Sequence, residues 1–401
     1  MVKQTSGQKI KRVAVIGTGL MGHGIAQTFA VMGYNVNLLS RNKTSLEKAM
    51  RDVEWSLNKF VEKGKITEKE AQTALSRIIP TTSYEQAAKD IDLAVEAISE
   101  NMELKKQLFA KIDQLSPIHA IIATNTSTLS VTEMGNATKR PHQTVGMHWF
   151  IPPQLSQLIE VIKGNDTSKE TLDAIMELSK NLGKIPILCK RDAAGFIVSR
   201  ILVAVFNEAF WTLHRKEASK HEIDASVKYA GGFPMGWFEL VDFVGVDVEY
   251  DVSKILYNSH GERYRPLLEL TEPLVKANKL GQKTGQGFYD WSKGRPNIPA
   301  ELKEKYDVER SWAVAVNEAA WMLQDNVADP KSIDLGMKLG TGWPFGPCEY
   351  ADNKGLDNIL STLQSNYGRY GLELYKPCPL LRKYINNGWT GKQVGKGFHE
   401  Y

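Results

Sequence analysis

The first half of the chain alternates between short runs of buried, β-branched residues and longer segments with apolar residues at helical spacing. Residues 12–40 illustrate this, because the apolar run RVAVIG leads into a glycine-rich turn, a helical segment and a second apolar run, NVNLLS. Further runs typical of buried strands occupy 91–98, 120–124, 144–150, 158–164 and 185–190. Strands that alternate with helices predict an α/β fold, a doubly wound sheet of parallel strands.

The strand pattern stops near Gly195, and the rest of the chain has helical periodicity and repeats itself at an offset of 110 residues. The matching positions are Asn207 and Asn317, Asp224 and Asp334, Gly232 and Gly342, Glu239 and Glu349, and Gly285 and Gly395. A constant offset across so many positions predicts two copies of one helical unit. We expect an α/β domain over 1–193, followed by an all-α region of two repeated helical domains, 194–292 and 308–401.

The composition is that of an ordinary globular protein, with 42% hydrophobic and 24% charged residues among 401. The net charge of +4 is too small to indicate nucleic-acid binding. No run reaches the ~18 apolar residues of a membrane-spanning helix, and no signal-peptide pattern follows the polar N-terminus. Three widely spaced cysteines (Cys189, Cys348, Cys378) favour neither disulfides nor a metal site. We expect a cytoplasmic protein with no metal.

The first chemical motif is a glycine triplet between the first strand and the first helix. Gly17, Gly19 and Gly22 form the pattern GxGxxG, with Leu20 and Met21 between the last two. In this context the glycines let backbone N–H groups and the helix N-terminus face a pyrophosphate. The alternative is an ordinary tight turn between a strand and a helix. The motif predicts a Rossmann-type domain that binds NAD or NADP.

The end of the second strand bears on which cofactor is bound. An acidic residue there binds the ribose 2′-hydroxyl of NAD, whereas a small residue beside an arginine leaves room and charge for the 2′-phosphate of NADP. This chain has Ser40 followed by Arg41. The pair favours NADP, with the alternative that Arg41 is only a solvated charge at a strand end.

A candidate acid–base pair follows later strands of the same domain. His148 lies at the end of the run 144–150 and Glu160 lies within LIEVI, while Ser127 follows the run 120–124. Carboxyl ends of strands in such a sheet converge on the ligand crevice. Glu160 would orient the imidazole and stabilise its charged form while the other ring nitrogen takes a hydroxyl proton. From spacing alone, a single histidine is more often structural than catalytic, so the alternative is that His148 is a packed core residue.

Several longer motifs together resemble the (S)-3-hydroxyacyl-CoA dehydrogenase family over residues 12–290. The motifs are GTGLMGHGIA, VEAISENMELKK, NTSTLS, GMHWFIPPQLSQLIEVI, DAAGFIVSRIL, GGFPMGWFELVDFVG and KTGQGFYDW. The resemblance implies that His148 is the catalytic base, that Glu160 is its partner, and that Ser127 faces the substrate hydroxyl or the cofactor. The duplicated helical unit further resembles the dehydrogenase part of multifunctional β-oxidation proteins.

The resemblance also implies binding residues outside this pair. Glu100, Lys105 and Lys283 fall on positions that contact the cofactor in the family. Ser56 and Lys63 fall on positions that reach the coenzyme A moiety.

Two positions depart from the family pattern. Ile151 stands where the family usually has an asparagine after HFF, and Ser199 stands where it has the asparagine of FIVNR. Both changes remove an amide able to bond the thioester carbonyl or the developing ketone, a preorganised donor worth ~3 kcal/mol of barrier. Ser199 keeps a shorter donor and Ile151 keeps none, so the substrate is less well defined than the fold.

The expected reaction is reversible oxidation of a 3-hydroxyacyl-CoA to a 3-ketoacyl-CoA, most simply on a short chain such as 3-hydroxybutyryl-CoA. One alternative is oxidation of a free hydroxy acid or sugar acid, as in gulonate-type relatives. Another is a nucleotide-binding protein without catalytic activity, against which the presence of both His148 and Glu160 argues.

The repeat also suggests an assembly. In single-copy family members the helical unit pairs with the same unit of a second subunit across a two-fold axis. Here the two copies can pair within one chain, so we expect an internal pseudo-dimer with one active site, a monomer or a weak homo-oligomer.

Overall fold

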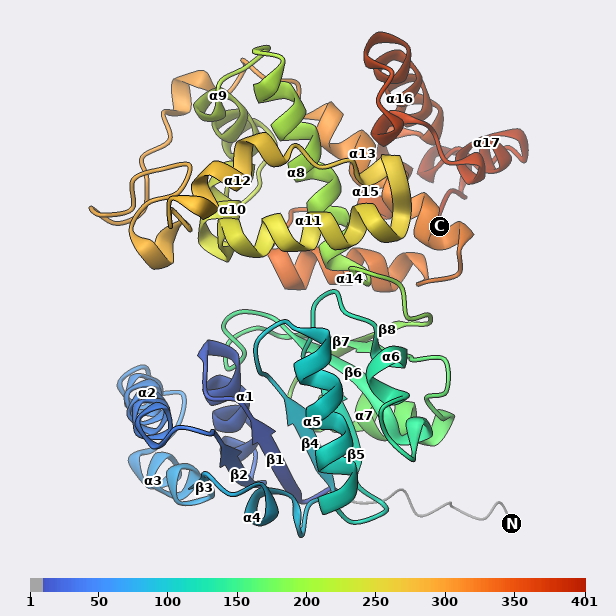
Figure 1. Ribbon diagram of the computed structural model, residues 1–401. Helices are drawn as coiled ribbons and strands as arrows, with labels where there is room; N and C mark the ends of the chain where they lie inside the picture. Colours follow the sequence, from blue (N-terminus) through green and yellow to red (C-terminus); the bar gives the residue numbers. More distant parts are fainter. Residues whose placement is uncertain (1–9) are drawn as a thin grey trace. The chain divides into compact units, whose positions relative to one another are not determined.

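The computed structural model describes residues 10–401, and its contacts divide the chain into two compact units that meet at Asp192 and Ala193. The first unit is the α/β part and the second is almost entirely helical (Figure 1). Each unit is described by itself.

The first unit is built on an eight-stranded sheet with the order β3-β2-β1-β4-β5-β6-β7-β8. Its strands are β1 (Arg12–Ile16), β2 (Asn35–Leu39), β3 (Ile78–Thr81), β4 (Leu93–Glu96), β5 (Ile121–Thr124), β6 (Thr144–Trp149), β7 (Leu158–Ile162) and β8 (Ile185–Cys189). The first six strands have the order of a dinucleotide-binding sheet, in which the order reverses beside β1. The predicted Rossmann-type fold class is confirmed.

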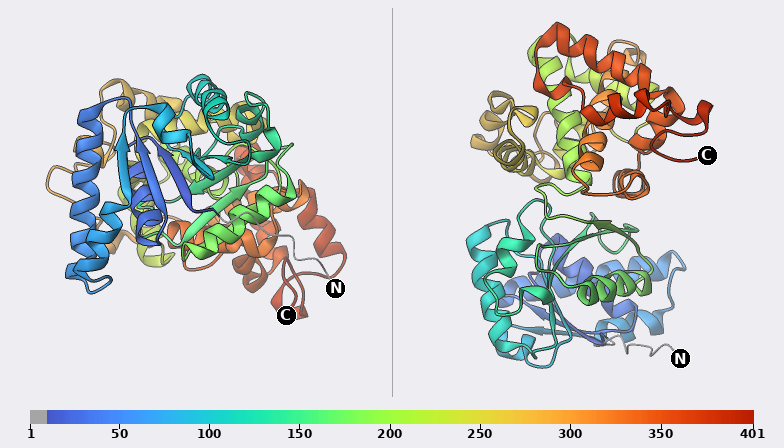
Figure 2. Two further views of the ribbon diagram at one scale, coloured as in Figure 1. Left: turned by 90° about the horizontal axis from the view of Figure 1, so that it is seen from below. Right: turned by 90° about the vertical axis from the view of Figure 1, so that its right-hand side faces the viewer.

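Helices cover both faces of this sheet, as the blue-to-green part of Figures 1 and 2 shows. One apolar core includes residues of α1 (Leu20–Val31), α2 (Lys43–Glu62), α3 (Glu68–Ser76) and α7 (Lys169–Asn181). The other includes residues of α4 (Tyr84–Ala88), α5 (Met102–Leu115) and α6 (Val131–Gly135). The central strands β1, β4, β5, β6 and β7 are therefore buried on both faces along almost all of their length, which explains why they appear in the sequence as continuous apolar runs.

Two features of the sheet differ from the prediction. β7 runs antiparallel to β6, so the expectation of parallel strands was wrong for this pair. Only the segment 150–157 joins the two strands, and a parallel connection needs a crossover of a dozen or more residues. β3 was not predicted, because this short edge strand contains Pro80, a residue that weakens a strand pattern.

The second unit repeats one series of helices. The first copy contains α8 (Val198–His214), α9 (Lys220–Ala225), a π-helical turn (Ser226–Ala230), α10 (Trp237–Val244), α11 (Val246–His260) and α12 (Leu268–Lys276). The second copy contains α13 (Glu309–Gln324), α14 (Pro330–Thr341), α15 (Pro347–Lys354), α16 (Leu356–Tyr370) and α17 (Pro379–Asn386). Short 3-10 turns (Pro141–Gln143, Gly261–Tyr264, Gln282–Thr284, Ala300–Leu302, Glu373–Tyr375, Lys392–Val394) complete the two units. In residues 10–401 no helix has the length and apolar character needed to cross a membrane.

The two copies contact each other through reciprocal pairs. Arg200 of the first copy donates from Nε to Glu318 of the second over 2.9 Å. Arg310 and Glu208, the residues related to these by the 110-residue offset, form the opposite pair at 2.9 Å. The same arginine–glutamate contact is therefore made in both directions between the copies. Such reciprocal contacts are typical of a two-fold interface.

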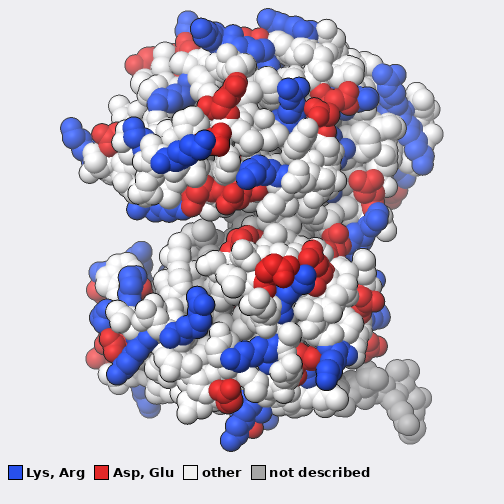
Figure 3. Space-filling view, in the orientation of Figure 1, with Lys and Arg blue, Asp and Glu red and all other residues white. Residues whose placement is uncertain are grey.

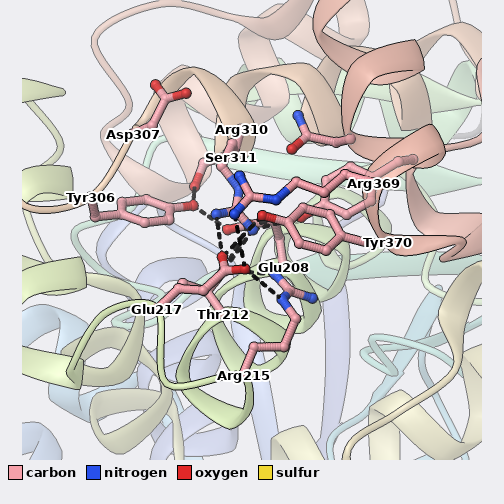
Figure 4. A network of polar contacts seen from close by, with 12 residues as sticks. Glu208, Thr212, Arg215, Glu217, Tyr306, Asp307, Arg310, Ser311, Arg369 and Tyr370 are labelled. Carbon is pink, nitrogen blue, oxygen red and sulfur yellow. Dashed lines mark hydrogen bonds and ion pairs between the residues drawn. The ribbon is translucent and has the colours of Figure 1, made fainter.

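Buried polar and aromatic groups surround these pairs. Figure 4 shows Glu208 at the centre of one such network, where it accepts from Thr212 over 2.9 Å and also from Tyr306. Phe233 lies against Trp343, its own counterpart in the other copy, with 5.0 Å between ring centres. A residue next to its own counterpart places the local two-fold axis of the repeat near these rings.

Charged residues of both signs are mixed over the surface of each unit on the face drawn in Figure 3. The excess of +4 is therefore not gathered into one basic area on that face.

Candidate functional site: a dinucleotide cavity and a histidine–glutamate pair

The glycine triplet has the geometry that a bound dinucleotide needs. Gly17 has φ +114°, and a Cβ there would lie 2.2 Å from the carbonyl oxygen of Ala97. A Cβ on Gly22 would lie 2.0 Å from the carbonyl oxygen of Gly17, so helix α1 can approach β1 only without a side chain. At Gly19 a Cβ would meet no atom within 4 Å. The first and third glycines therefore shape the turn, and the second leaves its backbone open to a ligand.

A cavity of about 440 Å³ opens beside this turn, at the ends of β1, β2 and β4. Its lining residues are Ile16, Gly17, Thr18, Gly19, Leu39, Ser40, Arg41, Tyr84, Ala97, Ile98, Ser99, Leu104, Gln107, Leu108 and Lys111. This apolar and hydroxyl-rich lining fits the adenosine half of a dinucleotide. Leu20, at the start of α1, is 54% exposed, while Met21 packs partly into the core.

The charge of this cavity bears on the choice between the two cofactors. Its lining contains Arg41 and Lys111 but neither aspartate nor glutamate. Asn42, the next side chain after Arg41, is occupied in capping α2, where it accepts from Thr44 N over 2.8 Å. Arg41 itself is exposed beside Ser40.

Lys111 and Tyr84 were missed from the sequence. The Lys111 ammonium lies 3.8 Å from the centre of the Tyr84 ring, and both line the cavity. They belong to α5 and α4, outside the glycine motif and the strand ends. Only the helical spacing of Leu104, Leu108 and Lys111 on α5 could have indicated the face that they share.

A buried ion pair lies next to Glu100, which was predicted to bind the cofactor. Lys105 is 1% exposed and donates to both carboxylate oxygens of Glu96, over 2.7 and 2.9 Å. It also lies 3.1 Å from Glu100. In this structure Lys105 holds Glu100 in place, and direct contact of Lys105 with a cofactor stays a prediction. Glu96 was missed, although it lies in the motif VEAISENMELKK, because it ends an apolar strand and nothing in the sequence pairs it with Lys105.

Glu100 in turn organises the turn that carries Ser127. Its carboxylate accepts from the hydroxyl of Thr126 and, over 3.3 Å, from the backbone N–H of Ser127. Glu100 and Ser127 were predicted from separate motifs, and the structure brings them together.

His148 and Glu160 also lie together. They are directly opposite in the antiparallel register of β6 and β7. His148 Nδ1 is 2.6 Å from Glu160 Oε2, and the two residues are 8% and 0% exposed. The backbone N–H of Trp149 donates to Asn125 over 2.8 Å, which fixes the end of β6 beside the Ser127 turn. A charge-assisted bond of this kind orients an imidazole for proton transfer.

The remaining predicted residues lie elsewhere on the two units. Ser56 is 5% exposed on the inner face of α2, and Lys63 is exposed at the end of that helix. In the helical unit, Ser199 is half-buried near the start of α8, and Lys283 forms an ion pair with Asp247 at 2.5 Å. Contacts of these residues with cofactor or coenzyme A stay predictions.

No three histidine, cysteine, aspartate or glutamate side chains in residues 10–401 form a group able to hold a metal ion.

Comparison with known proteins places this chain in a family. The model of the 3-hydroxyacyl-CoA dehydrogenase NAD-binding domain matches residues 12–193. The model of the C-terminal domain of the same enzymes matches twice, over 195–291 and 306–401.

Individual relatives agree with the family models. The chain is 42% identical over 282 residues to 3-hydroxybutyryl-CoA dehydrogenase of Clostridioides difficile, which covers 70% of this chain and 100% of that protein. It is 30% identical over 463 residues to 3-hydroxyadipyl-CoA dehydrogenase of Escherichia coli K12, covering 93% of this chain and 97% of that protein. A crystal structure of 3-hydroxybutyryl-CoA dehydrogenase from Escherichia coli K12 matches with a TM-score of 0.87 and 29% identity, over 95% of this chain and all of that one. The chain therefore belongs to the 3-hydroxyacyl-CoA dehydrogenase family, as a member with two copies of the C-terminal domain.

Proposed function

We propose that this protein catalyses the reversible oxidation of a short-chain (S)-3-hydroxyacyl-CoA, such as 3-hydroxybutyryl-CoA, to the 3-ketoacyl-CoA. The observation that carries the proposal is the 2.6 Å contact between His148 Nδ1 and the buried Glu160 carboxylate. A histidine held in this way is suited to take a proton from a substrate hydroxyl.

Glu160 sets the role of each ring nitrogen. Because an ionised carboxylate only accepts hydrogen bonds, Nδ1 of His148 carries the proton that faces it, and Nε2 is the basic nitrogen. Nε2 takes the proton of the C3 hydroxyl, and the buried carboxylate stabilises the resulting imidazolium. A dinucleotide held at the turn of Gly17, Gly19 and Gly22 would supply the hydride acceptor for C3. In the reverse direction His148 returns the proton to the developing alkoxide.

A short acyl chain is proposed from the relatives. The Clostridioides difficile relative and the solved Escherichia coli structure are both named as 3-hydroxybutyryl-CoA dehydrogenases. Ile151 follows His148 by three residues and is 43% exposed, so it offers an apolar surface rather than an amide.

We further propose that the enzyme uses NADP(H) at least as well as NAD(H). Two cations and no carboxylate line the adenosine cavity, and Ser40 occupies the position of the acid that binds the ribose of NAD. A 2′-phosphate beside Arg41 would gain charge-assisted hydrogen bonds.

The reciprocal pairs between the helical copies support an internal pseudo-dimer. Arg200 with Glu318 and Arg310 with Glu208 place within one chain the kind of contacts that a two-fold dimer makes between chains. We therefore propose a monomer with one active site.

The assay that tests the function compares acetoacetyl-CoA with the corresponding free acid and a sugar acid, each with NADH and NADPH or the oxidised forms. Turnover of the CoA thioester alone supports the proposal. Turnover of free acids without turnover of the thioester would contradict it.

A further inference from the structure

The segment 150–157 between β6 and β7 lies between the two proposed acid–base residues, and a buried lysine holds it from one side. Lys184, directly before β8, donates from Nζ to the carbonyl oxygens of Pro153 and Ser156 over 2.8 and 2.6 Å. It is 9% exposed, and its ammonium lies 5.7 Å from the centre of the Trp149 ring. One side chain thus ties the segment to β8 and to the end of β6.

The cofactor helix α1 supports the segment from another side. Gly24 has no side chain, and a Cβ there would lie 2.5 Å from Gln154 Oε1 and 2.8 Å from Pro153 Cγ. The segment therefore packs directly against the helix that starts at the glycine turn. Its position is set jointly by Lys184 and by the absence of a side chain at Gly24.

A lysine is a costly residue at this place, since burial disfavours its charged form. Burial lowers the pKa of Lys184 to about 8. The cost of burial is offset because the ammonium group donates to two backbone carbonyls at once. A methionine at this position would leave both carbonyls without this partner.

The segment presents two large apolar side chains to solvent. Ile151 is 43% exposed and Leu155 is 51% exposed, on a stretch that directly follows the strand of His148. An acyl group attached to the reacting carbon has to extend away from His148, and apolar side chains on the segment that follows the strand of His148 are suited to contact it.

We propose that Lys184 is a positioning residue that fixes the segment 150–157, so that Ile151 and Leu155 form an apolar wall for the acyl chain next to His148. The inference rests on the proposed acyl-CoA function. On this proposal, Ile151 and Leu155, held in place by Lys184, determine which acyl-chain length the enzyme prefers.

The test compares Lys184→Met and Lys184→Arg with Lys180→Met, an exposed lysine near the end of α7. Kinetics are measured on the full chain with acetoacetyl-CoA and with 3-ketohexanoyl-CoA at saturating reduced cofactor. For Lys184→Met we expect KM for the longer substrate to rise about tenfold, the scale of losing one or two methylene contacts in an apolar pocket. Turnover of acetoacetyl-CoA stays within about twofold. Lys184→Arg can still donate to both carbonyls, so its KM for the longer substrate should stay close to that of the wild type.

A role limited to stability would instead lower turnover of both substrates equally and leave both KM values unchanged. That result, or no change at all in Lys184→Met, would overturn the proposal. Gly24→Ala perturbs the same segment while keeping Lys184, and it should raise KM for the longer substrate in the same way. This variant decides the matter if Lys184→Met does not fold.

A second readout does not depend on activity. Amide hydrogen exchange within 150–157 should accelerate in Lys184→Met and not in Lys180→Met. Unchanged exchange would show that Lys184 does not hold the segment, whether or not the wild type acts on acyl-CoA. A wild type inactive on both thioesters but with faster exchange in the variant would contradict the proposed function and the wall, while the anchor would stand.

Discussion

Arg200 and Glu318, separated by 118 residues in the sequence, form a buried ion pair that joins the two copies of the helical domain. Their counterparts Arg310 and Glu208 form the same pair in the opposite sense. The arginine and the glutamate lie two turns apart on the same helix of each copy, α8 and α13. The two copies of the repeat therefore make the same arginine–glutamate contact in both directions within one chain.

The assembly prediction follows from these pairs. The full chain should be a monomer, and a truncation after Asp290 should form a dimer or aggregate because it exposes Arg200 and the apolar face of α8. Light scattering on both forms measures this. An obligate dimer of the full chain through the helical region, or a well-behaved monomeric truncation, would show that the second copy does not replace a subunit.

Removal of one buried partner should be strongly destabilising. Glu208 is 0% exposed, so Arg310→Met leaves a buried carboxylate without its ion pair and should lower the free energy of unfolding by about 3 kcal/mol. Arg369→Met is the control, since that side chain is 70% exposed and 3.9 Å from its partner. Its cost should be below about 0.5 kcal/mol. Urea unfolding measures both, and equal effects would refute the importance of the pair.

The repeat also supplies a test of pH dependence. His399 Nε2 lies 2.7 Å from Asp334, and this hydrogen bond raises the pKa of the histidine above 6.5. A raised pKa means that the folded state binds more protons, so this contribution to stability is present below pH 6.5 and is lost as the pH rises through the folded pKa. His399→Tyr reproduces the residue found at the matching position of the first helical copy, Tyr289, which donates to Asp224. Its melting temperature should fall less than that of the wild type between pH 5.5 and 8.5, and parallel curves would contradict the assignment.

The cofactor prediction concerns Ser40 and Arg41. Ser40→Asp should shift the preference toward NAD by repelling a 2′-phosphate, and Arg41→Ala should weaken binding of NADP but not of NAD. Dissociation constants of the four cofactor forms, measured by fluorescence titration, provide the readout. If the wild type binds NAD far better than NADP and neither variant changes the ratio, Arg41 is only a surface charge.

The features best predicted from the sequence are those with a direct structural cause, such as a position where only glycine fits. Gly17 and Gly22 are required by close backbone contacts, and the constant offset revealed the repeated helices. Prediction from the sequence failed where tertiary contacts decide. Glu96 and Lys105 lie on separate elements and become a pair only after folding, and Lys111 reaches the cavity from α5, outside the glycine motif and the strand ends.

The pairing of His148 with Glu160 was predicted only in part. Both residues were predicted, but through the carboxyl ends of parallel strands. The structure brings them together through an antiparallel register that the short segment 150–157 imposes. Both residues were thus predicted from the sequence, and the antiparallel geometry that brings them together was not.

The central claim is that His148 and Glu160 act together in proton transfer, and the turnover of His148→Gln, Glu160→Gln and the double variant on acetoacetyl-CoA tests it most directly. We predict that each single variant loses orders of magnitude in kcat with little change in cofactor dissociation constant, and that the double variant is no worse than His148→Gln, because Glu160 acts through the histidine. Near wild-type turnover in either single variant, or losses that multiply in the double variant, would contradict the account.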